Sequence, residues 1–162
     1  MPLSKLREFL DCNQIQYLVI SHSVAYTAQG IAALTHIKGK ELAKTVMVLV
    51  DGRLAMAVVP ASFRVDLHKL KKYLGAGMVE LASEQEFRGR FPDCETGSMP
   101  PFGNLYGMDV FADESLADDK EIAFNAGTHR ELVRMKFADF ERLAKPFVIP
   151  LAASVGRAHA AA

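Results

Sequence analysis

Two glycine-centred loops and one lysine carry the residue types in this sequence that could do chemistry. The first loop runs from Gly97 to Gly103 and places Pro100 and Pro101 between two glycines. Proline fixes φ and has no N–H to donate, whereas glycine lets another group approach the backbone closely. A rigid bend with few donors is a costly way to build an ordinary surface turn. We therefore expect this loop to form one wall of a binding pocket.

The second loop runs from Asn125 to His129 and is centred on Gly127. Gly127 and Thr128 could place backbone N–H groups and a hydroxyl around a carbonyl group or a water molecule. His129 could bind substrate or carry a proton. The structural alternative is a tight turn whose histidine faces solvent.

Lys44 lies at the start of the first strongly apolar run, immediately before Thr45. A lysine at the edge of a site can hold a phosphate or carboxylate, or stabilise the negative charge that develops on a carbonyl oxygen. The structural alternative is a lysine at a strand end that extends its amine to water. The sequence leaves both interpretations open.

Cys94 lies close to the proline loop and permits a Cys–His hydrolase with His22 or His129 as the base. Nothing around Cys94 indicates a depressed thiol pKa, and a free cysteine is usually a small apolar residue. We expect no metal site, because four histidines have no partner at metal-ligand spacing, namely His22, His36, His68 and His159. No glycine-rich phosphate-binding motif is present either, which argues against nucleotide hydrolysis.

The bulk composition indicates one domain, since 162 residues that are 50% hydrophobic can bury one core. No apolar run approaches the roughly 18 residues that span a bilayer, and the N-terminus lacks the apolar segment of a signal peptide. With two cysteines and no disulfide framework, we expect a cytoplasmic protein without a membrane partner.

Charge is distributed unevenly although the net charge is zero. Residues 1–75 carry ten Lys/Arg against five Asp/Glu, and residues 76–162 carry nine against fourteen. A one-sided basic surface is typical of a protein that binds a polyanion, although a solvated helix face would look the same. The basic residues of the first half include Lys38, Lys40, Lys44, Arg53, Arg64, Lys69, Lys71 and Lys72.

The hydrophobic pattern predicts a mixed α/β fold in which helices flank a central sheet. Asp51-Gly52 joins two apolar runs, which is a strong hairpin signal, and both runs are apolar on both faces, so the hairpin should be central. The predicted helices are 4–13, 27–37 with Gly39 beyond its end, 67–74, 83–92 and 137–144. The predicted strands are 15–21, 45–50, 54–59, 78–82, 107–112, 121–125 and 132–136.

These elements predict a single domain over residues 1–150, built on a mixed and partly barrel-like sheet. The alanine-rich residues 151–162 are expected to form a flexible tail.

Four segments, in this order, resemble the YbaK/ProX family of aminoacyl-tRNA deacylases, which includes the editing domain inserted in many bacterial prolyl-tRNA synthetases. The likeness covers roughly Tyr17 to Ala144. Four such segments in register are more specific than any one of them. They are Ala43-Lys44-Thr45-Val46, the unit from Asp66 to Ala82, the G-x-x-x-P-x-G loop from Gly97 to Gly103 with Pro101 as its proline, and Asn125 to His129.

The resemblance implies a small enzyme that acts in trans, without a metal or other cofactor, on the ester between a wrong amino acid and the 3′ end of a tRNA. The residues at catalytic positions are Lys44, Gly127, Thr128 and His129. The residues at substrate-binding positions are Gly97, Ser98, Met99, Pro101 and Phe102.

The resemblance also implies a role for each part of the site. Lys44 would anchor the terminal adenosine or the ester, and Gly97 and Pro101 would form the wall that selects side-chain size. Thr128 and its preceding glycine would place the carbonyl or the attacking water, and His129 would help to position substrate. The partner would be the acceptor stem of a mischarged tRNA, expected to be tRNA-Pro, with prolyl-tRNA synthetase as a further candidate.

The amino acid stays open among Ala, Cys, Ser and Thr. The Gly-x-His arrangement at Gly127 to His129 is similar to the alanine-editing branch, whereas Thr45 after the lysine is similar to the cysteine-editing branch. Two other functions remain in competition with the deacylase. One is a binding module for tRNA or a synthetase without catalysis, and the other is the Cys94 hydrolase.

Overall fold

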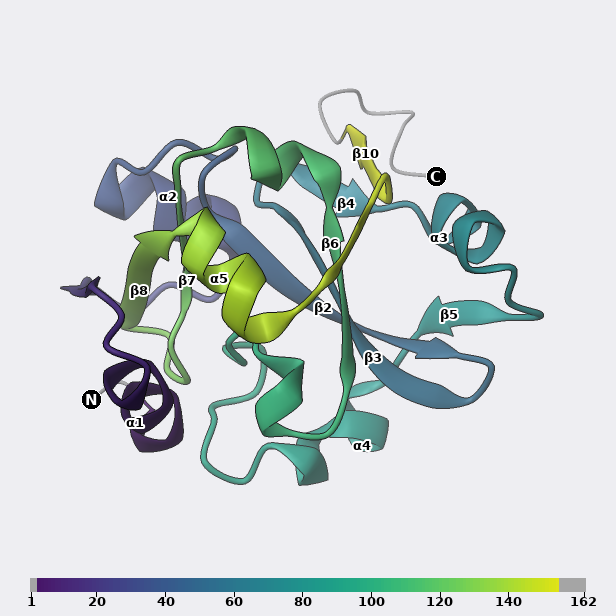
Figure 1. The fold of residues 1–162 in the computed structure, drawn as a ribbon, viewed down its shortest axis with the longest axis horizontal. Helices are drawn as coiled ribbons and strands as arrows, with labels where there is room; N and C mark the ends of the chain where they lie inside the picture. The colour runs from purple at the N-terminus through teal and green to yellow at the C-terminus, as the bar shows by residue number, and fades with distance from the viewer. Residues whose placement is uncertain (1–2, 155–162) are drawn as a thin grey trace.

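The apolar hairpin around Asp51-Gly52 forms the centre of the largest sheet, as predicted (Figure 1). Strands β2 (Ala43–Val50) and β3 (Arg53–Pro60) pair along their whole length. Asp51 and Gly52 both have positive φ, 48° and 83°, which is the backbone of the tight hairpin turns that match strand twist. The computed structural model describes residues 3–154.

The largest sheet has five strands in the order β5-β2-β3-β6-β9. The pairs β3–β6 and β6–β9 are parallel and the others are antiparallel, so the sheet is mixed, as predicted. Its other strands are β5 (Val79–Leu81), β6 (Asp109–Asp113) and β9 (Phe147–Ile149).

A second, antiparallel sheet has the order β1-β8-β7, and β4 pairs with β10 in a third. Because the strands described in residues 3–154 divide among three sheets, no closed barrel forms, and the partly barrel-like expectation was wrong in that detail. These strands are β1 (Tyr17–Ser21), β7 (Glu121–Asn125), β8 (Glu131–Lys136), β4 (Phe63–Val65) and β10 (Ala152–Ser154).

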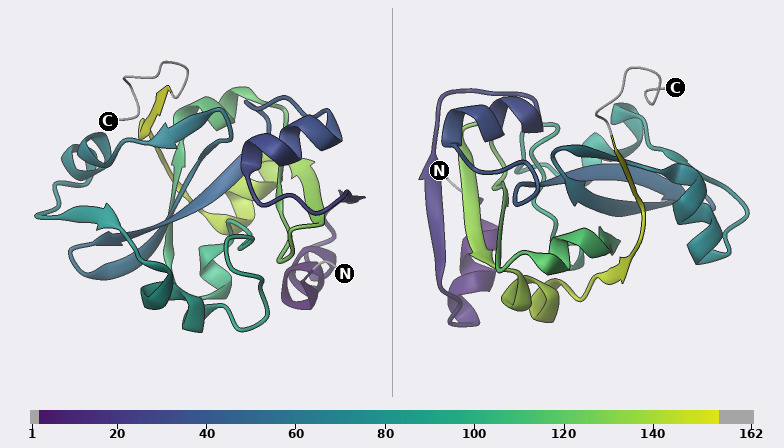
Figure 2. Two further views of the ribbon diagram at one scale, coloured as in Figure 1. Left: turned by 180° about the vertical axis from the view of Figure 1, so that it is seen from behind. Right: turned by 90° about the horizontal axis from the view of Figure 1, so that it is seen from above.

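The helices flank the sheets at both ends of the molecule. Figures 1 and 2 show α1 and α2 beside the three-stranded sheet, and α3 beside β5 at the opposite end. The α-helices are α1 (Ser4–Cys12), α2 (Ala28–Thr35), α3 (Leu67–Leu74), α4 (Glu84–Phe87) and α5 (Phe137–Ala144). Short 3-10 helices are η1 (Arg88–Arg90), η2 (Gly103–Leu105) and η3 (Glu114–Asp118).

Capping side chains define the starts of three helices as the sequence predicted, but the predicted end of α2 was wrong. Thr27 and Asp66 cap α2 and α3 through their side-chain oxygens, and Ser83 caps α4 in a capping box. The expectation that Gly39 follows the second helix was wrong, because α2 ends at Thr35 and the left-handed residue after it is His36, with φ of 59°.

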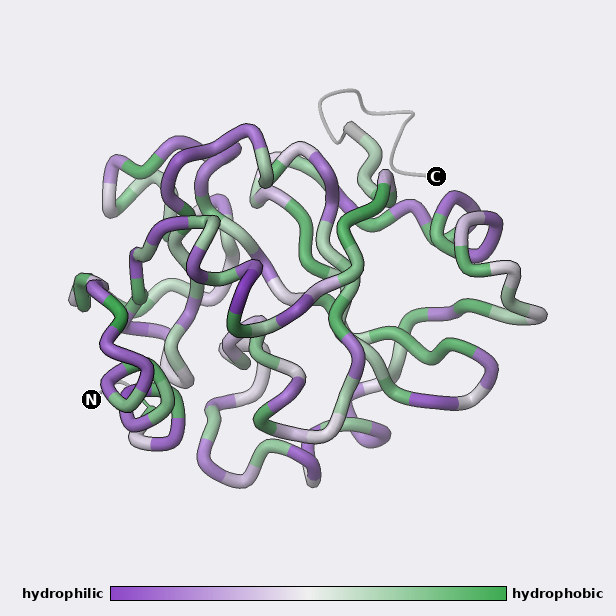
Figure 3. The backbone as a smooth tube through the Cα atoms, in the orientation of Figure 1, coloured by the Kyte–Doolittle hydropathy of each residue, from purple (hydrophilic) through white to green (hydrophobic). Residues whose placement is uncertain are grey.

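The hydrophobic core lies on both faces of the β2–β3 hairpin. In Figure 3 the two strands are mostly hydrophobic and their connecting turn is hydrophilic. The main cluster contains Ala43 and Met47 from β2, and a second cluster under α3 contains Val48. Adjacent β2 residues thus pack on opposite sides, as the two-residue period of a strand requires.

Residues 151–154, expected to be part of a flexible tail, instead pack on the fold. Leu151 is fully buried in the second cluster, and β10 pairs with β4. Apolar contact and ladder hydrogen bonds with distant segments hold this stretch, and its own composition gave no sign of them. Residues 155–162 of the expected tail lie outside the described residues.

Candidate active site

The two glycine loops are held together by hydrogen bonds. The Glu95 N–H donates to the Gly127 carbonyl at 2.8 Å, and the Gly127 N–H donates to the Ser98 carbonyl at 2.9 Å. The Glu95 carboxylate accepts a 2.7 Å hydrogen bond from the His129 N–H. The structure therefore places the proline loop beside the second loop. Glu95 makes two of these three hydrogen bonds.

The His129 ring has a defined tautomer. Its Nε2 lies 2.8 Å from the Thr96 carbonyl oxygen, which can only accept, so Nε2 carries a proton. In the neutral ring the lone pair is therefore on Nδ1, which is buried and has no hydrogen-bond partner among the described residues. The ring of Tyr26, which is 77% exposed, lies 4.8 Å from the His129 ring, centroid to centroid. His129 thus holds an unused acceptor beside an exposed aromatic ring.

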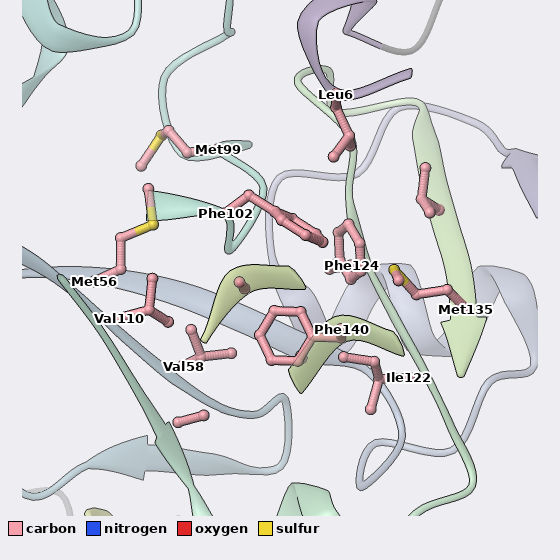
Figure 4. Close-up of a cluster of buried hydrophobic side chains, with 14 of the residues drawn as sticks. Leu6, Met56, Val58, Met99, Phe102, Val110, Ile122, Phe124, Met135 and Phe140 are labelled. Atoms are coloured by element: carbon pink, nitrogen blue, oxygen red, sulfur yellow. The ribbon is translucent and has the colours of Figure 1, made fainter. Parts of the chain in front are cut away.

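Only one of the five predicted binding residues is exposed. Gly97 has φ of +89° and lies next to the His129 ring, since a Cβ atom there would be 3.5 Å from Cε1. Ser98, Met99, Pro101 and Phe102 are buried. Phe102 is fully buried among the rings of Phe9, Phe124 and Phe140, and Figure 4 shows it inside the main cluster.

Most side chains of the proline loop are therefore buried in the hydrophobic core. Its apolar residues fill the main cluster, while its glycine end faces the histidine. The expectation that Phe102 contacts substrate does not fit its burial. The exposed part of the predicted wall is Gly97.

The backbone N–H of Thr128 is the donor of the second loop that could bind a ligand. The N–H groups of Gly127 and His129 are both hydrogen-bonded, whereas that of Thr128 has no partner among residues 3–154. The Thr128 hydroxyl donates to Glu131 at 3.4 Å and accepts from the Arg130 N–H at 3.3 Å. The loop can thus offer one backbone N–H, rather than several, to an oxygen atom of a ligand.

Lys44 lies on the face of β2 that carries Val46 and Val48, opposite the face of Ala43 and Met47. It lines a cleft of about 660 Å³ between β2, β4 and the start of α3. The other lining residues are Val46, Arg64, Val65, Asp66, Leu67, Leu81 and Ala153.

The Lys44 amine has no hydrogen bond or ion pair with any residue from 3 to 154. Burial lowers the pKa of Lys44 because partial removal from water disfavours the charged ammonium. A half-buried cation without a counter-charge attracts an anion or a developing negative charge. The Lys44 amine is thus partly shielded from water at the edge of a cleft, and its role in binding a ligand stays a prediction.

The structure does not place Lys44 in the same contact network as the glycine loops, but β7 connects the two. An isolated parallel bridge pairs Leu42, just before β2, with Ala123 in β7. Along the chain, Lys44 follows Leu42 by two residues and Asn125 follows Ala123 by two residues. The Asn125 Oδ1 atom is buried and has no partner among the described residues. Asn125 leads directly into the second glycine loop.

Cys94 has a different partner from the one a Cys–His hydrolase needs. Its Sγ lies 3.5 Å from the Tyr106 hydroxyl, and no hydrogen bond to histidine is found in residues 3–154. Burial raises the pKa of the Cys94 thiol, which favours the unreactive protonated form. The geometry does not support Cys94 as a nucleophile.

Sequence reasoning missed Glu95, Tyr26 and the role of Asn125. Glu95 stands two residues before Gly97, but no spacing rule connects it to His129 in the other loop. Its contact depends on the fold that brings the loops together. The exposure of Tyr26 was equally invisible in the sequence.

The described residues contain neither a cluster of metal ligands nor a membrane-spanning helix. No group of three or more His, Cys, Asp or Glu side chains in residues 3–154 could hold a metal ion. None of the helices described there has the length and apolar character to cross a membrane.

Comparison with known proteins identifies the family. A family model described as the aminoacyl-tRNA editing domain matches residues 22–143. The multifunctional Ser/Thr-tRNA deacylase ProXp-y of Escherichia coli strain K12 is 30% identical over 150 residues, which cover 90% of this chain and 89% of the deacylase. The proline–tRNA ligase of Bacillus cytotoxicus is 33% identical over 89 residues, which cover 55% of this chain.

The chain spans 16% of the length of that ligase, so the likeness concerns one part of it. Among solved structures, a protein proposed to be a trans-editing enzyme for prolyl-tRNA synthetase superposes with a TM-score of 0.78 at 20% identity. The superposition covers 93% of this chain and 96% of that one, and it shows the same fold. The family match spans the hairpin, Lys44 and both glycine loops, and the chain belongs to the aminoacyl-tRNA editing domain family.

Proposed function

We propose that this protein is a trans-acting deacylase that hydrolyses the ester of a mischarged aminoacyl-tRNA. The observation that carries the proposal is Lys44, a half-buried cation with no counter-charge among residues 3–154, in a cleft of about 660 Å³. Its position matches the lysine implied by the family resemblance. The name of the Escherichia coli relative, a Ser/Thr-tRNA deacylase, supports the same activity.

The proposed reaction needs little more than positioning and charge stabilisation. A water molecule attacks the carbonyl carbon, the bond to the ribose oxygen breaks, and that oxygen leaves with a proton. Because an aminoacyl ester is already activated, a protein nucleophile is not required. Lys44 stabilises the negative charge on the carbonyl oxygen.

The second loop holds the reacting groups in this proposal. The buried Nδ1 of His129 accepts a hydrogen bond from the substrate or from the attacking water. The Thr128 N–H donates to the substrate, and Gly97 forms the part of the wall that faces the amino acid. The Asn125 amide oxygen, which is buried and has no partner among residues 3–154, binds a donor of the aminoacyl-ribose end.

The proposed substrates are small amino acids, Ser, Thr, Ala or Cys, on tRNA-Pro in the cytoplasm. Ser and Thr are supported by the name of the deacylase relative, and the proline tRNA by the match to a proline–tRNA ligase. A synthetase hydrophobic site cannot strongly exclude smaller side chains, which is why separate hydrolysis is needed. The basic first half of the chain contacts acceptor-stem phosphates, which position without reading sequence.

A deacylation panel tests the proposed function. Purified protein is added in catalytic amount to tRNA-Pro charged with Ala, Cys, Ser or Thr, and the free amino acid is measured over time. The proposal predicts several turnovers on at least one of them and none on correctly charged Pro-tRNA. Binding of tRNA with an unchanged ester lifetime across the panel would contradict the deacylase and favour the binding module.

A further inference from the structure

The chain returns across the Lys44 cleft after β9. We call residues 151–154 the C-terminal strap. Its strand β10 runs antiparallel to β4, pairing Ala152 with Val65 and Ala153 with Arg64. Figure 1 shows β10 beside β4 and near α3. The strap lies outside residues 22–143, which the family model matches.

A buried carboxylate anchors the strap. Asp113 is 5% exposed, and its Oδ1 accepts hydrogen bonds from the N–H groups of Leu151 at 2.9 Å and Ala152 at 3.0 Å. Its Oδ2 accepts from the N–H and the hydroxyl of Ser115. Charge-assisted bonds of this kind are roughly twice as strong as neutral ones. The strap is therefore held in place from the side of β6.

Two further contacts fix the strap at α3. The Lys69 ammonium donates to the Ala152 carbonyl at 3.1 Å, and the Leu151 carbonyl accepts from the Asp66 N–H at 2.7 Å. Leu151 is fully buried. The strap is thus anchored both at β6, through Asp113, and at α3, through Asp66 and Lys69.

Ala153 is the strap residue that lines the cleft, together with Lys44, Arg64 and Leu81. Its side chain is a single methyl group, so any larger side chain there would project into space that a ligand could occupy. The cleft also holds the ammonium group of Lys44, which suits an anionic group of a nucleotide. None of its lining residues comes from the glycine loops, where the amino acid is proposed to lie.

We propose that the strap forms the wall against which the 3′-terminal nucleotide of the tRNA binds, and that Ala153 determines the room left for it. This inference rests on the proposed deacylase function and adds the binding place of the nucleotide. The amino acid lies outside this wall, on the His129 side. Enlarging Ala153 therefore weakens binding of every aminoacyl-tRNA to the same degree.

Ala153→Leu tests the inference, with Ala117→Leu as the matched control because Ala117 is exposed on η3. The expected result is a rise in KM of about tenfold for both Ser- and Ala-charged tRNA, with kcat and the ratio between the two substrates unchanged. The affinity for the uncharged trinucleotide CCA, measured by calorimetry, should fall by a similar factor. The control should leave all of these at the wild-type level.

Three outcomes overturn the inference: an unchanged KM in Ala153→Leu, a loss confined to one amino acid, or no binding of CCA to an active wild type. A wild type that hydrolyses no mischarged tRNA contradicts the proposed function itself, which separates the two failures. Amide hydrogen exchange at Ala152 shows whether the strap stays docked in the variant. If the strap does not stay docked in Ala153→Leu, the same measurements are made on Ala153→Val, whose branched side chain suits a strand. The expected and contradicting results are the same for both variants.

Discussion

The carboxylate of Glu95 accepts a hydrogen bond from the backbone N–H of His129 at 2.7 Å, which joins two loops 34 residues apart. The Thr96 carbonyl next to Glu95 in turn accepts from the ring of the same histidine. One short segment thus fixes both the backbone and the side chain of His129. The orientation of His129 therefore depends on Glu95 and Thr96, which immediately precede the proline loop.

Glu95→Ala should lower kcat by about tenfold to a hundredfold while changing KM little, because a small displacement of a reacting group has effects of this size. The variant removes the acceptor of the His129 N–H, while the two backbone hydrogen bonds between the loops remain. Single-turnover deacylation and the dependence of rate on substrate concentration measure the two parameters separately.

Glu95→Gln is the control for that variant, since its amide oxygen can still accept from the His129 N–H. It should recover most of the activity that Glu95→Ala loses. Equal activity in both variants and in the wild type would show that His129 does not need this hydrogen bond.

Gly103→Ala should destabilise the fold by about 1–3 kcal/mol, the usual effect of overpacking. A Cβ atom at Gly103 would lie 2.5 Å from the Met108 carbonyl oxygen and 2.7 Å from Val110 Cγ2, so backbone has to move. Urea unfolding measures the change. Gly89→Ala is the control, because a Cβ atom there has nothing within 4 Å, and a loss of stability as large as that of Gly103→Ala would contradict the steric explanation.

The two cysteines should differ in reactivity and neither should be needed for catalysis. Cys12 is exposed, whereas burial raises the pKa of Cys94 and leaves it protonated near neutral pH. Iodoacetamide should therefore label Cys12 first, as peptide mass spectrometry can show, with deacylation retained. Rapid labelling of Cys94 with parallel loss of activity would instead support the Cys–His hydrolase.

The burial of Lys44 predicts a pH dependence of stability. Because its pKa is lowered in the folded protein, the folded state binds this proton more weakly than the unfolded chain does. Burying the ammonium therefore reduces stability below the folded pKa, and this penalty disappears as the pH rises toward the unfolded value of about 10.4.

Wild type should accordingly gain stability relative to Lys44→Met as the pH rises from about 7 to about 10. Urea unfolding of both proteins at each pH measures the difference, and titration of the other groups cancels in the comparison. A difference that stays constant over this range would show that Lys44 is as well solvated in the folded state as in the unfolded chain.

The sequence predicted those parts of the fold that depend on neighbouring residues. Asp51-Gly52 adopts the positive-φ turn that its residue types favour, and Asp66 and Ser83 cap their helices as predicted. These features need only a few consecutive residues. The strands β4, β9 and β10 were missed because each has three residues and forms only by pairing with a distant partner.

The residue types of the candidate site could be read from the sequence, but their arrangement could not. Lys44, Gly97 and His129 were proposed from glycine, proline and charge patterns, and their roles in a site remain predictions. The partners of these residues, such as Glu95, come from elsewhere in the chain and follow from packing. The burial of Phe102 was missed for the same reason, since an apolar residue in a loop can face either a ligand or the core.

Replacement of Lys44 tests the central claim most directly. Single-turnover hydrolysis of the best substrate from the deacylation panel is compared among wild type, Lys44→Ala and Lys120→Ala, the last being the control at an exposed lysine. The proposed charge stabilisation predicts a rate loss of about a hundredfold or more in Lys44→Ala, with its far-UV circular dichroism unchanged and Lys120→Ala fully active. A Lys44→Ala variant that hydrolyses the ester as fast as Lys120→Ala would contradict the mechanism.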